Sequence, residues 1–288
     1  MTTSRSGLAA ILALLLAAWP GSGRAEEPTA EEPRVAEAPS PLAPPAPPPR
    51  PRLTLHFTKH ALVTGGLLLF TGVTQYYDYK LVPSECRWCT PGQFDVWVRN
   101  ELIWSDTKTA STASDALMVA VPAGAALALI FTARANGAGG REVAEDLLVM
   151  AEATATATAM MQLAKFPTAR LRPDAWAEGG ATSPGSRMSF WAGHSSSAFA
   201  VAASVTQVSR MRGRASWKWI GLATFTGAAG VSWMRIAADR HWGTDVLVGT
   251  AVGTAVGLAV PLLVLHPADE RTPAVTLVPA PGGLALLF

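Results

Sequence analysis

The sequence has little charge and no concentrated basic surface. Charged residues make up 15% of its 288 residues and the formal net charge is only +2, whereas soluble domains usually contain about 25% charged residues. The Lys and Arg residues are scattered along the chain, which argues against a nucleic-acid partner. No feature of the sequence predicts a protein partner.

The sequence also lacks the residue clusters that hold metals. It contains two cysteines and five histidines, and no group of acidic or His residues has the spacing of a metal site. The cysteines, Cys86 and Cys89, are separated by two residues. Zinc would need two further ligands, and a redox role would need a thioredoxin-like context, so the pair predicts a small structural disulfide. We expect no metal and no cofactor.

The two ends of the chain differ in composition from its middle. Residues 1–25 combine a basic start, a short apolar run and a small-residue exit, which predicts a secretory signal peptide. An uncleaved anchor is the weaker alternative, because a span needs about 20 apolar residues. Residues 26–52 are rich in proline and predict a semi-extended linker. Residues 267–288 predict an irregular tail, which leaves residues 53–266 as the main domain.

Apolar residues make up 49% of the chain and gather in six segments of this domain. They predict an all-α bundle of about six core helices, inserted in a membrane. Acidic residues interrupt the third segment, which a span tolerates when they face the bundle interior. A soluble all-α bundle is the alternative. The segments are Ala61–Gln75, Asp115–Arg134, Val143–Ala164, Ser195–Val208, Trp217–Met234 and Val246–Leu265.

Loop charge predicts how the bundle is oriented. Four cations crowd residues 210–218, and short cytoplasmic loops carry excess Lys and Arg. The loops at the opposite ends of the helices, which hold the candidate chemistry, should then face the periplasm. We expect a protein of the bacterial inner membrane with a periplasmic active site, or alternatively a soluble periplasmic protein. Cleavage of the signal peptide would place the proline-rich linker on the periplasmic side, whereas this topology places it on the cytoplasmic side. The sequence does not resolve this conflict.

Three short blocks of the sequence contain residue types that are common in catalytic sites, and the first two lie at one end of an apolar segment each. Lys165–Pro173 contains three cations at the end of one segment, which the helix dipole or the membrane surface would explain if the block stood alone. Ser189–Ser197 precedes another segment, where a glycine and free helix N–H groups can bind an anion. A Ser-rich cap beside an interfacial histidine is the plainer explanation.

The third block, Arg235–Asp245, joins the last two apolar segments. His241 and Asp245 are four residues apart, so in a helix the carboxylate could hold the imidazole by a hydrogen bond and leave the other ring nitrogen as a nucleophile. A lone His–Asp pair at an interface is common and needs no chemistry. The three blocks in order are far more specific than any one of them.

Together the blocks resemble the signature of the type 2 phosphatidic acid phosphatase (PAP2) family, KxxxxxxRP, PSGH and SRxxxxxHxxxD. The resemblance covers residues 53–266. It departs from the family at Trp191 and Ala192, where Pro and Ser are expected, and at Met234, where Ser is expected. The matching residues are Lys165, Arg172, Pro173, Gly193, His194, Arg235, His241 and Asp245.

The resemblance implies a metal-independent phosphatase that hydrolyses a phosphate monoester or diphosphate through a phosphohistidine intermediate. We expect the substrate to be a phosphorylated lipid. His241 would attack phosphorus, Asp245 would orient it and His194 would protonate the leaving oxygen. Positive charge and amide donors suit phosphoryl transfer, which needs charge stabilisation and in-line positioning. Ser195 could supply the hydroxyl that the second motif lacks. The implied phosphate-binding residues are Lys165, Arg172, Gly193, Ser195 and Arg235.

Two other functions fit parts of the same pattern. A vanadium-dependent haloperoxidase shares the oxyanion pocket, but such enzymes are usually longer and soluble. A non-catalytic membrane or lipid-binding relative would explain the altered second motif. The charged and proton-moving positions are all present, which favours the phosphatase.

Overall fold

The computed structural model describes residues 51–268, 276–280 and 283–287. The expected signal peptide and all but the last two residues of the expected linker lie outside these residues and stay predictions. The helices are α2 (Phe57–Tyr76), α3 (Asp78–Leu81), α4 (Gln93–Leu102), α5 (Thr107–Ala135), α6 (Gly140–Thr168), α7 (Pro173–Ala177), the 3-10 helix η1 (Pro184–Arg187), α8 (Gly193–Met211), α9 (Trp217–Ala237) and α10 (Gly243–Val264). The strands are β1 (Leu53–Thr54), β2 (His266–Pro267), β3 (Thr276–Ala280) and β4 (Gly283–Leu287).

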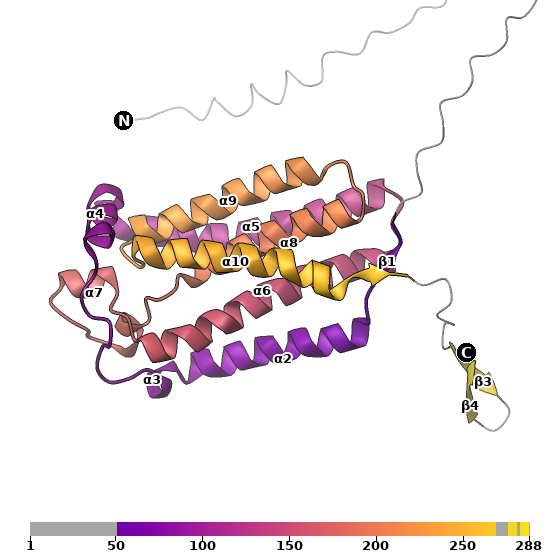
Figure 1. The fold of residues 1–288 in the computed structure, drawn as a ribbon, viewed down its shortest axis with the longest axis horizontal. Coiled ribbons are helices and arrows are strands. Elements are labelled where there is room, and N and C mark those ends of the chain that lie inside the picture. Colours follow the sequence, from indigo (N-terminus) through magenta and orange to yellow (C-terminus); the bar gives the residue numbers. More distant parts are fainter. Residues whose placement is uncertain (1–50, 269–275, 281–282, 288) are drawn as a thin grey trace, which may run out of the picture. The chain divides into compact units, whose positions relative to one another are not determined.

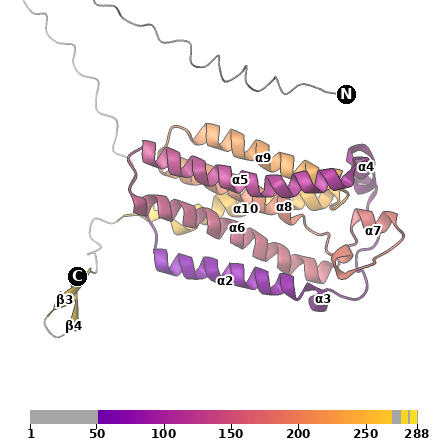
Figure 2. The ribbon, with the colours of Figure 1, turned by 180° about the vertical axis from the view of Figure 1, so that it is seen from behind.

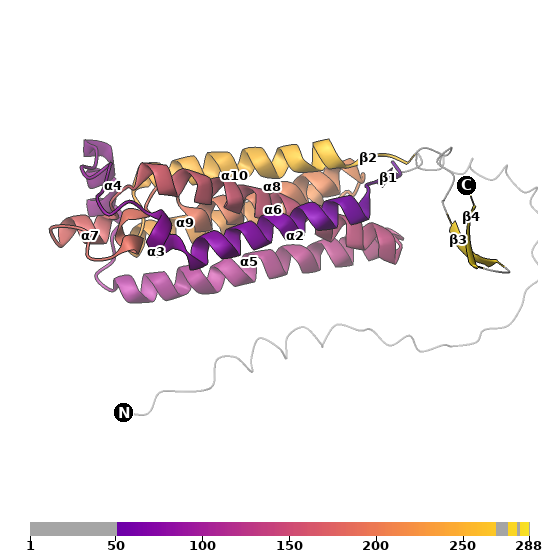
Figure 3. The same ribbon diagram turned by 90° about the horizontal axis from the view of Figure 1, so that it is seen from below.

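Six long helices, α2, α5, α6, α8, α9 and α10, run side by side and form a bundle (Figure 1). Each contains one of the six apolar segments, so the predicted all-α bundle is confirmed. Successive long helices run in opposite directions, as the two further views show (Figures 2 and 3). The short helices α3, α4 and α7 therefore gather at one end of the bundle, and β1 and β2 lie at the other (Figure 1).

The centre of the bundle is α8, which packs against α5, α6, α9 and α10. Its contact with α10 is unusually close because α10 presents a stripe of glycines. A Cβ atom at Gly249 would lie 2.6 Å from the backbone oxygen of the residue that caps the N-terminus of α8. At Gly253 and Gly257 it would lie 2.2 Å and 2.5 Å from backbone oxygens of α8 itself. Real Cβ atoms do not approach so closely, so the two helix backbones can touch only because these residues are glycine. This contact fixes the position of the α8 N-terminus relative to the α10 N-terminus.

The outer surface of the bundle is apolar over much of its length. Among the described residues, α5, α6 and α10 are long and apolar enough to cross a membrane. Soluble monomers rarely expose large contiguous apolar patches, so this exterior fits a membrane rather than water. Large exposed apolar side chains include Leu62, Leu69, Phe131, Leu163, Trp219 and Leu263.

The acidic residues that interrupt α6 are paired inside the bundle. Glu152 lies 2.9 Å from Nδ1 of His60, and Asp146 accepts hydrogen bonds from Arg212, at 2.9 Å, and from Arg214. Both arginines are almost fully buried, at 4% and 1% exposure. These two cations of the basic loop are therefore committed to internal ion pairs, which weakens the loop-charge argument for the orientation of the bundle.

The region after α10 is more regular than the sequence suggested. β2 pairs antiparallel with β1, with Leu53 opposite Pro267, which ties the start of the bundle to the end of α10. Within the expected irregular tail, β3 and β4 form an antiparallel pair. Each of these two strands is a short apolar run, and two such runs close together in sequence favour pairing.

Candidate active site

The three blocks meet at the end of the bundle that carries α3, α4 and α7. α6 ends at Thr168 because Ala169 adopts the left-handed conformation, with φ of 40°, and the chain then crosses the end of the bundle. The second block starts α8, and the third forms the turn from α9 into α10. A cavity of about 300 Å³ lies where they converge. Its walls include Lys165, Arg172, Gly193, His194, Arg235 and His241.

His241 lies in the turn just before α10 and is 3% exposed. Its Nδ1–H donates a hydrogen bond of 2.8 Å to the backbone carbonyl of Ser189. This contact fixes the tautomer and leaves Nε2 as the unprotonated nitrogen. Burial lowers the pKa of His241 well below its usual value, and nearby cations, Lys165 foremost, act in the same direction. The imidazole is therefore neutral at neutral pH, which a nitrogen nucleophile requires.

Asp245 supports the position of His241 indirectly and does not form a hydrogen bond to its imidazole. Its nearest oxygen lies 3.8 Å from Nδ1 of His241, which is beyond hydrogen-bond distance, because His241 precedes the helix that carries Asp245. The fully buried carboxylate instead accepts hydrogen bonds from the Ser189 hydroxyl at 2.5 Å and the Trp242 amide at 3.1 Å. Asp245 thus supports Ser189, and Ser189 orients His241.

Arg170 is the buried counter-ion of this acidic group. Its guanidinium is 1% exposed and binds both Asp245 and Asp95, the latter at 2.5 Å. Thr244 completes the network, because its amide donates to Asp95 at 2.8 Å and its hydroxyl accepts from Arg170 at 2.8 Å. One arginine therefore joins α4, the first block and the start of α10.

Three cations line the cavity beside His241. Lys165 and Arg235 are 7% and 5% exposed, at the ends of α6 and α9. Arg172 leads into α7, where its amide donates to the Ser186 carbonyl at 2.8 Å. Burial, followed by the charge of neighbouring arginines, lowers the pKa of Arg172 to about 10, so it stays charged at neutral pH. The positive charge of these side chains favours the binding of an anion in the cavity.

His194 stands at the mouth of the same cavity, in the first turn of α8. Its Nε2–H donates to the carboxylate of Asp115 at 3.0 Å, and Arg235 lies 3.4 Å from the same carboxylate oxygen. Burial, and then the charge of Arg235, lower the pKa of His194 to about 4, although Asp115 raises it. In this structure His194 is therefore neutral at neutral pH.

The remaining residues of the second block divide between the cavity wall and the protein interior. Gly193 lines the cavity at the α8 N-terminus, where the first helix N–H groups have no intrahelical acceptor. Ser195 is fully buried and its hydroxyl has no partner among the described residues, but it does not line the cavity. Ala192 is also fully buried and Trp191 is 9% exposed, so Trp191 does not face the surface.

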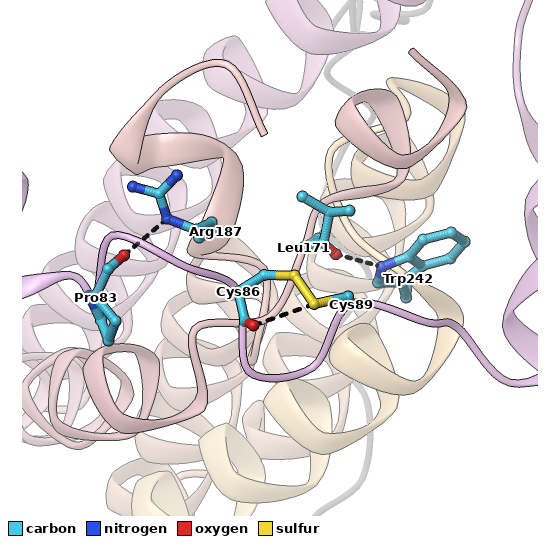
Figure 4. The surroundings of a disulfide bond; sticks show 6 residues. All are labelled: Pro83, Cys86, Cys89, Leu171, Arg187 and Trp242. Atoms are coloured by element: carbon cyan, nitrogen blue, oxygen red, sulfur yellow. Dashed lines mark hydrogen bonds between the residues drawn. A yellow bond between two sulfur atoms is a disulfide. The ribbon is translucent and has the colours of Figure 1, made fainter. Parts of the chain in front are cut away.

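A disulfide joins Cys86 and Cys89 in the loop that lies over the first block (Figure 4). The guanidinium of Arg170 stacks on the ring of Trp88, 3.8 Å from its centre, and Leu171 donates its amide to the Trp88 carbonyl at 3.1 Å. The loop thus covers the buried Arg170. Among the described residues no group of three or more His, Cys, Asp or Glu could hold a metal ion.

Sequence reasoning missed four residues of this site. Arg170 lies inside the first block and Ser189 begins the second, but neither has a place in the motifs. Asp95 and Asp115 lie 75 and 79 residues from their site partners, Arg170 and His194. Only the sequence context of Arg170, a third cation between two matched positions, could have drawn attention to it.

Comparison with known proteins agrees with this geometry. The model of the PAP2 superfamily matches residues 146–267. This PAP2 region begins within α6 and ends just after α10, so it contains all three blocks but not Asp95 or Asp115. This match supports a phosphatase of the PAP2 type.

The other two comparisons add little. No curated protein matches the sequence significantly. Among solved structures, a transmembrane PAP2-type phosphatidylglycerolphosphate phosphatase from Bacillus subtilis is 19% identical, with a TM-score of 0.38. The match covers 76% of this chain and 99% of that one. Similarity at this level says nothing about the substrate of the present chain.

Proposed function

We propose that this protein is a metal-independent phosphatase that acts through a phosphohistidine on a phosphate monoester or diphosphate of a lipid. The observation that carries the proposal is one cavity in which a buried, neutral His241 faces three cations and a second histidine. That combination offers a nucleophile, charge stabilisation and a proton donor within one anion-sized space.

In the first step, Nε2 of His241 forms a bond to phosphorus while the bond from phosphorus to the leaving oxygen breaks. His194, which is protonated when the phosphate is bound, gives its proton to that oxygen, so the alcohol or phosphate leaves in protonated form. Lys165, Arg172 and Arg235, together with the free N–H groups at the α8 N-terminus, hold the three remaining phosphoryl oxygens.

In the second step, water attacks phosphorus and the bond to Nε2 of His241 breaks. His194, now neutral, takes a proton from the attacking water, and phosphate leaves. Each histidine then has the protonation state that it had at the start of the first step, so one turnover consumes only substrate and water.

The placement of the cavity supports a lipid substrate. It lies at the end of a bundle whose sides are apolar, and its lining continues from the cations to Met118, Thr158 and Met161 on α5 and α6. Exposed aromatic side chains surround the same end, and Trp and Tyr favour the membrane–water interface. They include Tyr76, Tyr79, Trp88, Trp97, Trp104 and Trp233. We propose that the site opens at the periplasmic surface of the inner membrane.

The test is hydrolysis of a phosphorylated lipid by the purified protein, measured as released phosphate. Activity should persist in EDTA, and vanadate should block it because it mimics the phosphoryl transition state. His241→Ala serves as the inactive control. Activity that disappears in EDTA and returns with one particular divalent ion would exclude the mechanism.

A further inference from the structure

We propose that Asp115 on α5 is a positioning residue, which holds His194 as the proton donor to the leaving oxygen. This inference rests on the proposed phosphatase function. Asp115 belongs to none of the three blocks and lies outside the PAP2 region.

The geometry is that of an aspartate–histidine pair at the cavity mouth. One carboxylate oxygen of Asp115 is 3.0 Å from Nε2 of His194 and 3.4 Å from Nη1 of Arg235. The contact engages Nε2, so Nδ1 remains as the ring nitrogen that can present a proton to substrate. The Asp115 side chain is 62% exposed and that of His194 31% exposed, which puts the pair where a leaving group would depart.

The charges around His194 explain why the pair matters. Arg235 from α9 and Lys165 from α6 both oppose protonation of His194, and burial acts the same way. His241, from the α9–α10 turn, is neutral, and Asp78 of α3 lines the same cavity. Within the described part of the chain, Asp115 is the one carboxylate hydrogen-bonded to His194. It therefore supplies the interaction that favours the imidazolium, the form that a general acid must adopt.

The same contact has a second explanation that the test must separate. The Asp115 carboxylate could instead act as a plug, meaning that it occupies the phosphate site by pairing with Arg235 and that phosphate must displace it. A plug would slow binding, so its removal would raise kcat/KM. A positioning residue would slow proton donation, so its removal would lower kcat for poor leaving groups.

The kinetic experiment compares Asp115→Asn with wild type on two substrates. An alkyl phosphate lipid has a poor leaving group and needs the acid, whereas p-nitrophenyl phosphate does not. Asp115→Asn should lower kcat about 10-fold to 100-fold for the alkyl ester and less than about threefold for the aryl ester. Asp115→Glu should restore part of the alkyl activity. Glu101→Gln, which removes an exposed carboxylate at the same end of the bundle, should change neither rate.

The pH profile gives a second readout. Activity that needs protonated His194 falls as pH rises through its pKa, and loss of Asp115 lowers that pKa. The basic limb of kcat/KM for the alkyl ester should therefore move to lower pH in Asp115→Asn. The titration of the substrate itself is common to both enzymes and cancels in the comparison.

The third readout does not depend on turnover. NMR titration of the histidine rings, with His194 assigned from its loss in His194→Gln, should show a lower pKa for His194 in Asp115→Asn than in wild type. If wild type proves inactive but this shift occurs, the proposed function fails and the pairing stands. Equal losses on both esters, a raised kcat/KM, or an unmoved His194 titration would each overturn the positioning role.

Discussion

Asp245 offers the sharpest test of how the nucleophile is held, because the structure separates it from His241. The distance of 3.8 Å to Nδ1 of His241 means that Asp245 acts through Ser189. Asp245 accepts a hydrogen bond from the Ser189 hydroxyl, and the Ser189 carbonyl accepts one from His241. We therefore expect Asp245→Asn to damage the stability of the fold more than the chemistry.

The magnitude follows from the partners of the carboxylate. An asparagine in the same place would turn its oxygen toward Arg170, since the opposite orientation would set two donors face to face. Its NH₂ group would then face the Trp242 amide, which loses its acceptor, and the Ser189 hydroxyl, which can rotate to accept. An unsatisfied buried donor costs about 1–3 kcal/mol and a hydrogen bond to a charged group contributes about 1.5–3 kcal/mol.

Together these losses predict about 3 kcal/mol, because Arg170 keeps Asp95 as a partner and the full cost of an orphaned buried charge does not apply. For a chain of this size that corresponds to a fall in Tm of roughly 6–12 °C. The hydrogen bond from His241 to the Ser189 carbonyl survives, so kcat should fall only about 10-fold, from looser positioning of the ring.

The assay is thermal unfolding in detergent, followed by kcat on a phosphorylated lipid at a temperature where both proteins are folded. Ser189→Ala is the matched control, since it removes the hydroxyl but keeps the carbonyl. It should cost about 1–2 kcal/mol and leave kcat nearly unchanged. If Asp245→Asn left Tm unchanged but lowered kcat as severely as His241→Ala does, Asp245 would contact the imidazole directly and the argument from geometry would be wrong.

Three further predictions follow from the same structure. His241→Ala should abolish turnover, whereas His194→Ala should retain slow phosphorylation of His241 by aryl phosphates and accumulate the phosphoenzyme detected with ³²P. Small, equal effects would contradict both roles. Gly253→Ala should lower Tm, since its Cβ would meet a backbone oxygen of α8 at 2.2 Å, whereas alanine at an open glycine of α2 should not lower it. In a cysteine-free background, single cysteines at Ser183 and Ala215 should react oppositely with a membrane-impermeant thiol reagent in intact cells, and equal labelling would exclude the spanning topology.

Much of the fold could be predicted because it depends on local composition. Long apolar runs form helices whose sides must be buried or face lipid, and each of the six runs became one long helix of the bundle. The acidic interruptions of α6 could not be explained from sequence, because their partners come from elsewhere. Asp146, for example, meets Arg212, which lies 66 residues later. Such pairs appear only when the helices are placed.

The site divides in the same way. His241, His194 and the three cations stand at fixed spacings within short blocks, so their types and order point to phosphate chemistry. The groups that hold these side chains in place do not stand at fixed spacings in the sequence. Asp95 reaches Arg170 only because α4 packs against the start of α10. The four-residue spacing of His241 and Asp245 suggested a direct hydrogen bond, yet the helix begins between them, so the tautomer is set by a backbone carbonyl instead.

The proposed mechanism gives the two histidines of the cavity different roles, and their different surroundings support that division. Burial, and then the charges of Arg235 and Lys165, oppose a positive charge on His194, which is neutral with a pKa of about 4. A bound phosphate opposes that repulsion, since two unit charges 4 Å apart at an effective dielectric constant of about 20 interact by about 4 kcal/mol. Phosphate binding must therefore favour protonation of His194, and protonation of His194 must tighten phosphate binding by the same factor. His241 is deeper, donates Nδ1–H to a neutral carbonyl, and keeps Nε2 free for phosphorus. In the proposed mechanism His194 is thus charged when substrate is present, while burial favours the neutral form of His241.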